Sequence, residues 1–247
     1  MGKDIVCFKL GCGEKKIILQ AGIHAREYIT TLFLLKEIEY LKNFALNCEI
    51  YVVPMMNPDG IQLVLTNAIN NHKKFQFLKR INCGDNFSLF KANVNGVDLN
   101  TNFDADWGKG KNNIKTPASE NYVGHKPESE KETCALVEFT KKIKPTLTIS
   151  YHCKGEVVYF GFDGLDRKFF KQQKQLAKLI GKTLKYKISK AKGSVGGYKD
   201  FCLKQLSISS FTVEVGNDKF SHPFPTSQLG IIFNQNKNLP LVLMKHI

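Results

Sequence analysis

The succession of apolar segments predicts an α/β fold, namely a single-domain three-layer α/β/α arrangement around a central, mixed and mostly parallel twisted sheet. Short apolar runs with the length of buried strands alternate with longer segments of helical periodicity. The 247 residues are enough to bury a large core. Neither an internal repeat nor a linker-like tract interrupts the chain, so we expect one domain over residues 1–247.

Each element is expected from its own pattern. We expect strands at 17–23, 49–56, 146–151, 157–160 and 209–215, and helices at 27–42, 129–142, 165–183 and from 196 onward. The segment NPDG at 57–60 has the composition of a turn. Residues 70–125 are rich in Asn, Gly and Lys with little periodicity, so we expect long loops, which in a compact domain are usually functional.

The chain is strongly basic. It has 36 Lys and Arg against 22 Asp and Glu, a formal net charge of +14. A surface of this kind suits an anionic partner, but the basic residues are spread along the chain, which favours a general lysine-rich composition. No nucleic-acid-binding motif is recognisable and the aromatic residues are not interleaved with the basic ones, so we do not expect nucleic acid as a partner.

The cysteines and the N-terminus bear on location. Seven cysteines without a C-x-x-C pair favour reduced thiols, and argue against a disulfide scaffold or a cysteine-based zinc site. The first residues lack the apolar core of a signal peptide, and no stretch approaches the ~18 apolar residues of a membrane span. If this N-terminus is native, we expect a cytoplasmic protein without a membrane partner. The oligomeric state does not follow from the sequence.

Two histidines and a glutamate lie at the ends of expected strands. His24 and Glu27 form a His-x-x-Glu turn after strand 17–23, and His152 ends strand 146–151. Strand ends of an open α/β sheet are where active sites form. His-x-x-Glu alone is more often a surface histidine with a solvated glutamate. With His152, however, the set matches a zinc site of two imidazoles and one carboxylate that leaves a fourth position for water.

A further carboxylate, Glu214, lies inside the apolar strand 209–215. Burial of a charged group in such a strand is costly, so a functional role is one interpretation. The other is a residue on an edge strand that faces solvent.

Taken together, these segments resemble the zinc carboxypeptidase family. The matching segments, in the order of the family, are GIHAREYIT (22–30), NPDG (57–60), NGVDLNTNFDADWG (95–108), SENYVG (119–124), SEKET (129–133), TISYH (148–152), GGYKDF (196–201) and SFTVEVG (210–216). The resemblance covers nearly the whole chain. It implies the fold of that family, one Zn²⁺ per chain and the activity of a zinc metallopeptidase on a peptide substrate.

The resemblance also implies roles for single residues. His24, Glu27 and His152 match the zinc ligands, and Asp98 matches a carboxylate that orients a ligand imidazole, that of His24. Glu214 matches the general base and acid, which takes a proton from zinc-bound water as the nucleophile and passes it to the leaving amine.

Further matches concern the substrate. Arg80 matches the arginine that stabilises the oxyanion, with a surface cation as the alternative interpretation. Arg26 matches an arginine that contacts the substrate, with simple packing beside the metal as the alternative. Asn100 matches an asparagine that binds the terminal carboxylate or the backbone of the substrate.

The chain departs from the digestive carboxypeptidases at three places. Thr101 replaces the arginine that clamps the C-terminal carboxylate, and a threonine cannot form a bidentate ion pair. The mobile tyrosine of the family would lie near Lys192, and Tyr198 is a nearby but offset substitute. Lys199 matches the residue at the base of the specificity pocket, where it would favour an anionic group; a solvated lysine at a helix start is the alternative.

In these departures the chain resembles the γ-D-glutamyl-L-diamino acid endopeptidases of bacterial cell-wall metabolism. The matching segments are FKANVNGVDLN, which precedes Thr101, and GGYKDF, which precedes the general base. The leading expectation is therefore hydrolysis of the γ-D-glutamyl–meso-diaminopimelate bond of anionic murein peptides. One alternative is a zinc carboxypeptidase that releases acidic C-terminal residues. Another is a non-catalytic binding module for an anionic polymer with a vestigial site.

Overall fold

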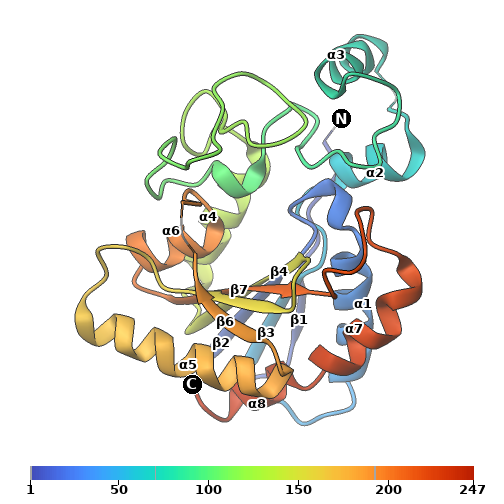
Figure 1. The fold of residues 1–247 in the computed structure, drawn as a ribbon. Helices are drawn as coiled ribbons and strands as arrows, with labels where there is room; N and C mark the ends of the chain where they lie inside the picture. The colour runs from blue at the N-terminus through green and yellow to red at the C-terminus, as the bar shows by residue number, and fades with distance from the viewer. Residues whose placement is uncertain (1, 70, 192) are drawn as a thin grey trace.

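A twisted sheet forms the centre of the molecule (Figure 1). The computed structural model describes residues 2–69, 71–191 and 193–247, and within them the sheet has the strand order β1-β3-β2-β4-β7-β5-β6. The strands are β1 (Phe8–Leu10), β2 (Lys16–Gln20), β3 (Glu49–Val53), β4 (Leu147–Cys153), β5 (Val157–Phe160), β6 (Lys187–Lys190) and β7 (Ser209–Val215). The pairs β1–β3 and β5–β7 are antiparallel and the others parallel, which confirms the predicted mixed, mostly parallel sheet.

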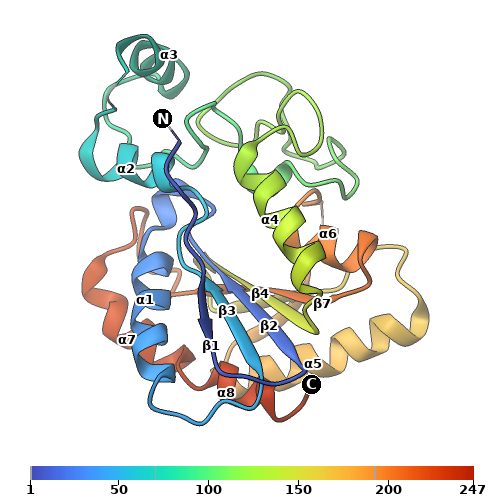
Figure 2. The same ribbon diagram turned by 180° about the vertical axis from the view of Figure 1, so that it is seen from behind.

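Helices cover both faces of the sheet. They are α1 (Ile29–Leu41), α2 (Pro58–Thr66), α3 (His72–Asn82), α4 (Lys131–Ile143), α5 (Arg167–Leu184), α6 (Tyr198–Gln205), α7 (Leu229–Asn236) and α8 (Leu239–Met244), with short 3-10 turns η1 (Ala25–Glu27), η2 (Leu99–Thr101) and η3 (Thr226–Gln228). Helices α1, α5, α7 and α8 share one apolar cluster with the sheet, and α4 and α6 share another on the opposite face (Figures 1 and 2). The predicted three layers are confirmed.

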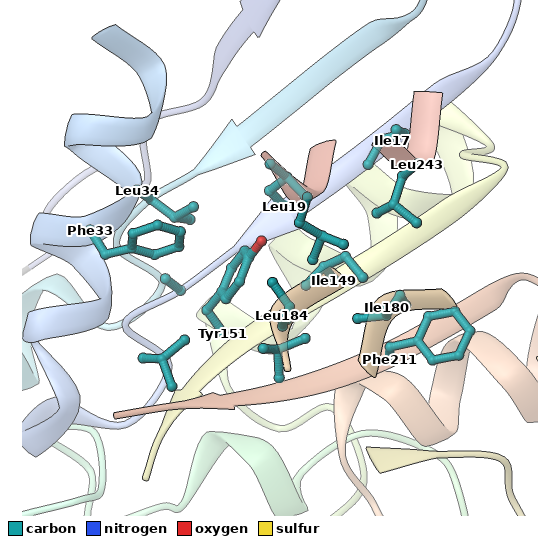
Figure 3. Packing of buried hydrophobic residues seen from close by; sticks show 14 of the residues in the cluster. Ile17, Leu19, Phe33, Leu34, Ile149, Tyr151, Ile180, Leu184, Phe211 and Leu243 are labelled. Atoms are coloured by element: carbon teal, nitrogen blue, oxygen red, sulfur yellow. The ribbon is translucent and has the colours of Figure 1, made fainter. Parts of the chain in front are cut away.

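The larger core lies between the sheet and α1, α5, α7 and α8 (Figure 3). Alternate residues of neighbouring strands enter it, such as Leu19 of β2 and Ile149 and Tyr151 of β4, and all three are fully buried. Phe33 of α1 packs edge-to-face on Tyr151, with ring centroids 4.9 Å apart. Each such aliphatic or aromatic side chain stabilises the fold by about 1.5–3 kcal/mol on burial.

Two segments differ from the sequence expectation. The residues expected as a turn at 57–60 begin helix α2, because Asn57 caps it by accepting a hydrogen bond from Gly60 N at 3.0 Å and Pro58 suits the first turn. The expected loop 70–125 contains α3, capped by Asn71, whose side chain accepts from Lys74 N. Its remaining described residues are mostly irregular.

Among the described residues, no helix combines the length and the apolar character needed to cross a bilayer.

Candidate metal centre

Three parallel strands deliver the candidate residues to one edge of the sheet. Strand β2 pairs with β4, and β4 with β7, all in the same direction. The chain leaves β2 toward His24 and then forms η1, which carries Glu27. His152 lies near the end of β4, directly opposite Glu214 of β7 in the register of the two strands. The carboxyl ends of parallel strands thus gather residues that are far apart in sequence.

The side chains of His24, Glu27 and His152 converge on one point. Their ligand atoms lie within 4.8 Å of one another, and all three residues are buried. Nδ1 of His24 lies 2.8 Å from Glu27 Oε1, Nδ1 of His152 lies 3.2 Å from Glu27 Oε2, and the two Nδ1 atoms are 3.2 Å apart. Two imidazole nitrogens and a carboxylate that face each other can hold a cation between them, and this donor set fits zinc. The structure therefore brings the three predicted ligands together.

A buried carboxylate supports the first imidazole from behind. Asp98 is fully buried, and its Oδ1 lies 3.2 Å from His24 Nε2, on the side of the ring away from Glu27. Its Oδ2 lies 2.8 Å from Lys91 Nζ and accepts from the backbone N–H of Asn121, while Oδ1 also accepts from the backbone N–H of Asn100. Burial by itself would raise the pKa of Asp98, but Lys91 and His24 outweigh burial and hold this pKa well below its usual range.

Glu27 is an ionised ligand for the same kind of reason. Burial acts to raise its pKa, yet His24 and His152 hold the pKa well below the ordinary value. The backbone N–H of Cys153 donates to Glu27 Oε2 at 3.1 Å, which fixes the carboxylate further. The neighbouring carboxylates Glu27 and Asp98 raise the pKa of His24 against the opposing effect of burial. The site is thus strongly charged although water is mostly excluded from it.

Glu214 has the environment of a general base. It is partly buried and lines a cavity of about 600 Å³. Burial raises the pKa of Glu214 to about 7, while the nearby His152 acts in the opposite direction. A carboxyl group with a pKa near neutrality can both accept and release a proton at physiological pH.

The same cavity contains a buried ion pair. Lys199 at the start of α6 pairs with Asp200 and donates to the backbone carbonyl of Gly161 at 2.9 Å; both charged residues are buried. Asn100 also lines the cavity, and its Oδ1 accepts from Tyr198 N at 3.2 Å. The cavity thus brings the predicted Lys199 and Asn100 to the vicinity of Glu214.

Other predicted residues are placed differently. Tyr198 is fully buried and its hydroxyl bonds to Thr140 Oγ1 at 2.7 Å, so the prediction that it contacts substrate is wrong. Its ring fills the core between α6 and α4, because the first turn of α6 faces the sheet. Arg80 is exposed in the last turn of α3, with its guanidinium 5.8 Å from the ring centre of Phe77. Figures 1 and 2 both show α3 beyond α2 and away from the sheet, so the structure does not bring Arg80 to the metal centre.

Two further predicted residues, Arg26 and Thr101, make hydrogen bonds to the backbone. Arg26 donates to Leu89 O at 3.2 Å and lies 3.3 Å from Glu120, and its contact with substrate stays a prediction. Thr101 is buried and donates its hydroxyl to Asp98 O at 2.9 Å. The position near Lys192 suggested for the mobile tyrosine lies outside the described residues.

Two residues of the site were missed by the sequence reasoning. Lys91 precedes the GVD motif in FKANVNGVD, and Asp200 directly follows Lys199. Each charge is adjacent to a motif that was recognised, which is the signal that could have found them. Their partners, however, are defined only by the fold.

Comparisons with known proteins agree with this geometry. The profile of a family described as zinc carboxypeptidase matches residues 9–238. The chain is 28% identical over 246 residues to gamma-D-glutamyl-L-diamino acid endopeptidase 1 of Lysinibacillus sphaericus, covering 92% of this chain and 60% of that protein. The chain thus spans about 60% of the length of this relative.

Two solved structures share the fold. Bovine thrombin-activatable fibrinolysis inhibitor, in complex with tick carboxypeptidase inhibitor, superposes with a TM-score of 0.76 at 19% identity, covering 98% of this chain and 85% of that one. Murein-tripeptide amidase MpaA from Escherichia coli O157 superposes with a TM-score of 0.60 at 23% identity, covering 92% and 83%. At these identities the likeness establishes the architecture alone.

Proposed function

The chain belongs to the zinc carboxypeptidase family, and we propose that it is a zinc metallopeptidase that hydrolyses the γ-D-glutamyl–meso-diaminopimelate bond of murein peptides. The observation that carries the proposal is the buried group of His24, Glu27 and His152 with Glu214 beside it in the strand register. Bound zinc would supply a Lewis acid that polarises the scissile carbonyl.

The protein side of the reaction rests on Glu214. As a carboxylate it accepts a proton from the attacking water, and as a carboxylic acid it returns that proton to the leaving amine. Its pKa of about 7 makes both forms accessible near neutrality. Asn100, which lines the same cavity, supplies an amide for the substrate backbone.

The ion pair in the cavity supports the choice of substrate. Lys199 and Asp200 are buried together, so the base of the cavity is close to neutral instead of purely cationic. The side chain of meso-diaminopimelate ends in an ammonium and a carboxylate on one carbon. Such a zwitterion can place its carboxylate toward Lys199 and its ammonium toward Asp200, whereas a simple acidic side chain leaves Asp200 unmatched.

Thr101 supports the same choice. Its hydroxyl is already engaged by Asp98 O and it carries no charge, so this position offers no guanidinium to a C-terminal carboxylate. Recognition would then depend more on the side chain in the cavity than on the chain terminus.

The second candidate is a zinc carboxypeptidase that releases acidic C-terminal residues. Lys190 lines the same cavity as Lys199, and two cations there favour an acidic side chain. Lys190 is paired with the exposed Asp163, however, which reduces its free charge. A non-catalytic module is less well supported, because nothing in such a role requires Glu214 beside an intact ligand set.

A digest of defined peptides tests the proposal. Zinc-loaded protein would be given L-Ala-γ-D-Glu-meso-diaminopimelate, the same peptide with L-Lys in place of diaminopimelate, and peptides that end in α-linked Glu, with products identified by mass spectrometry. We expect cleavage of the first, and a kcat/KM at least about tenfold lower for the L-Lys peptide, because the partner of Lys199 is missing. Release of α-linked Glu alone would establish the carboxypeptidase instead.

A further inference from the structure

Lys91 is a partly buried cation that contacts the carboxylate beside His24 and has no role in the function above. Its side chain is only 17% exposed, and its Nζ lies 2.8 Å from Asp98 Oδ2. Its backbone is fixed on both sides, because Ala25 N donates to Lys91 O and Lys91 N donates to Ser119 O, each at 3.0 Å. Lys91 is therefore tied to the residue that directly follows His24.

We propose that Lys91 is a positioning residue for the zinc ligand His24 and acts through Asp98. The contacts form a chain from Lys91 Nζ to Asp98 Oδ2 and from Asp98 Oδ1 to His24 Nε2 at 3.2 Å. At the other end of the imidazole, Nδ1 faces Glu27. The ring is thus held with one nitrogen on the carboxylate and the other toward the metal. This inference rests on the metal centre of the proposed function and not on its substrate.

The physical reason is the burial of Asp98. Burial of a carboxylate is costly unless cations and hydrogen-bond donors compensate its charge. His24 cannot be the permanent cation, because an imidazole that ligates zinc is neutral. With His24 neutral, Lys91 is, within residues 2–69, 71–191 and 193–247, the positive charge that contacts Asp98, helped by the N–H groups of Asn100 and Asn121. Without it, the carboxylate would lose the contact that fixes its Oδ2, and the imidazole on Oδ1 would lose its orientation.

The test measures metal binding, without substrate. Lys91→Met keeps the aliphatic stem and removes the charge, while Lys91→Arg keeps the charge. Zinc affinity is measured by competition with a chelator, and the absorption spectrum of the Co²⁺-loaded protein reports ligand geometry. We expect Lys91→Met to weaken zinc binding about 10–100-fold and to alter the Co²⁺ spectrum, and Lys91→Arg to restore most of both. Lys79→Met is the matched control, because Lys79 is also partly buried and paired at 2.8 Å with an aspartate, Asp85.

A double-variant cycle makes the inference specific. If Lys91 acts through Asp98, Lys91→Met adds little loss of zinc affinity in the Asp98→Asn background. Independent, additive losses would overturn the proposal. So would unchanged zinc affinity and an unchanged Co²⁺ spectrum in folded Lys91→Met, even if kcat fell, because that outcome places Lys91 on the substrate. If Lys91→Met does not fold, the same two measurements on Lys91→Gln decide. Failure of the peptide digest would leave these results untouched.

Discussion

Glu214 shows how one position in a strand determines the chemistry of a residue. It lies opposite His152 in the β4–β7 register, so its carboxyl group is held beside the metal ligands by backbone hydrogen bonds and not by a flexible loop. The partial burial of the side chain raises its pKa to about 7. The two facts have one origin, since Glu214 lies near the end of β7, in the part of the strand that lines the cavity.

Replacement of Glu214 by Gln should remove the proposed general base while preserving the shape of the side chain. We expect kcat to fall by about 10²–10⁴-fold, with zinc still bound. Because the ionised form is the base, wild-type kcat/KM should rise with pH through the pKa of Glu214. Bound zinc, as a nearby positive charge, places that midpoint at or below about 7. Rates measured from pH 5 to 8 check this, and a Gln variant with normal activity would refute the assignment.

Another buried carboxylate, that of Glu37 in α1, lies away from the metal ligands in the larger core. It is fully buried in the core, and both of its oxygens lack a hydrogen-bond partner among the described residues. Burial raises its pKa from 4.5 to about 9, against the weaker effect of Lys237. Since the folded state binds the extra proton, the contribution of Glu37 to stability falls as pH rises between these two pKa values.

Glu37→Met should therefore stabilise the protein. At pH 7 we expect the free energy of unfolding to rise by about 1–3 kcal/mol, because an unpaired buried polar group is removed. Urea unfolding at pH 6 and at pH 8.5 should show a larger gain at the higher pH. Glu39→Met on the exposed side of the same helix is the control and should change stability little. Equal gains at both pH values would contradict the role given to Glu37.

At the scale of elements, the turn before α6 and the 3-10 turn η2 form one supporting unit. Gly196 has φ +85°, and its carbonyl accepts from Phe103 N at 3.0 Å. A Cβ on Gly196 would lie 2.9 Å from the carbonyl oxygen of Thr101. The two segments thus touch through their backbones, and the contact sets the distance between Asn100 on η2 and Lys199 on α6.

Gly196→Ala should disturb this unit. We expect a loss of about 1–3 kcal/mol in stability, from both the positive φ and the close approach, together with a higher KM. Gly230→Ala in α7 is the control, because no atom lies within 4 Å of its added Cβ and it should be neutral or slightly stabilising. Thermal unfolding and steady-state kinetics of both variants measure stability and KM. Equal effects of the two substitutions would contradict a specific role of Gly196 in the shape of the cavity.

Elements with strong local patterns were predictable from the sequence. Strands β4 and β7 and helices α1, α4 and α5 appear within a few residues of their expected positions, since apolar periodicity is a local property. Helix α3 was not expected, because its apolar residues Phe75 and Leu78 stand in an Asn- and Lys-rich context. Strand β6 is short and largely exposed, so it has no apolar signal.

Contacts between residues far apart in the sequence were harder to predict. The resemblance to a family pointed to His24, Glu27 and His152, which the fold gathers. The partners of Lys91 and Lys199 and the burial of Tyr198 depend on packing, which a single sequence does not encode locally. Tyr198 was misplaced for this reason: a residue at the start of a helix can face either the cavity or the sheet.

At the scale of the whole molecule, the metal centre joins two distant parts of the chain. His24 and Glu27 follow β2, whereas His152 belongs to β4, and the parallel pairing of these strands brings them together. In the metal-free protein, the negative charge of the Glu27 carboxylate must be compensated by the two adjacent imidazoles. A bound cation replaces this arrangement with direct ligation, so metal binding and the folding of the β2–β4 edge are linked.

Removal of zinc by a chelator should therefore lower the thermal stability. A ligand present at about 1,000 times its Kd stabilises the folded state by about 4 kcal/mol. For a chain of this size that corresponds to a shift in Tm of roughly 8–16 °C. Glu27→Gln preserves the side-chain volume but weakens ligation, so its Tm should respond much less to added zinc. Calorimetry of both proteins with and without zinc measures the difference, and an equal response of the two would show that Glu27 is not a ligand.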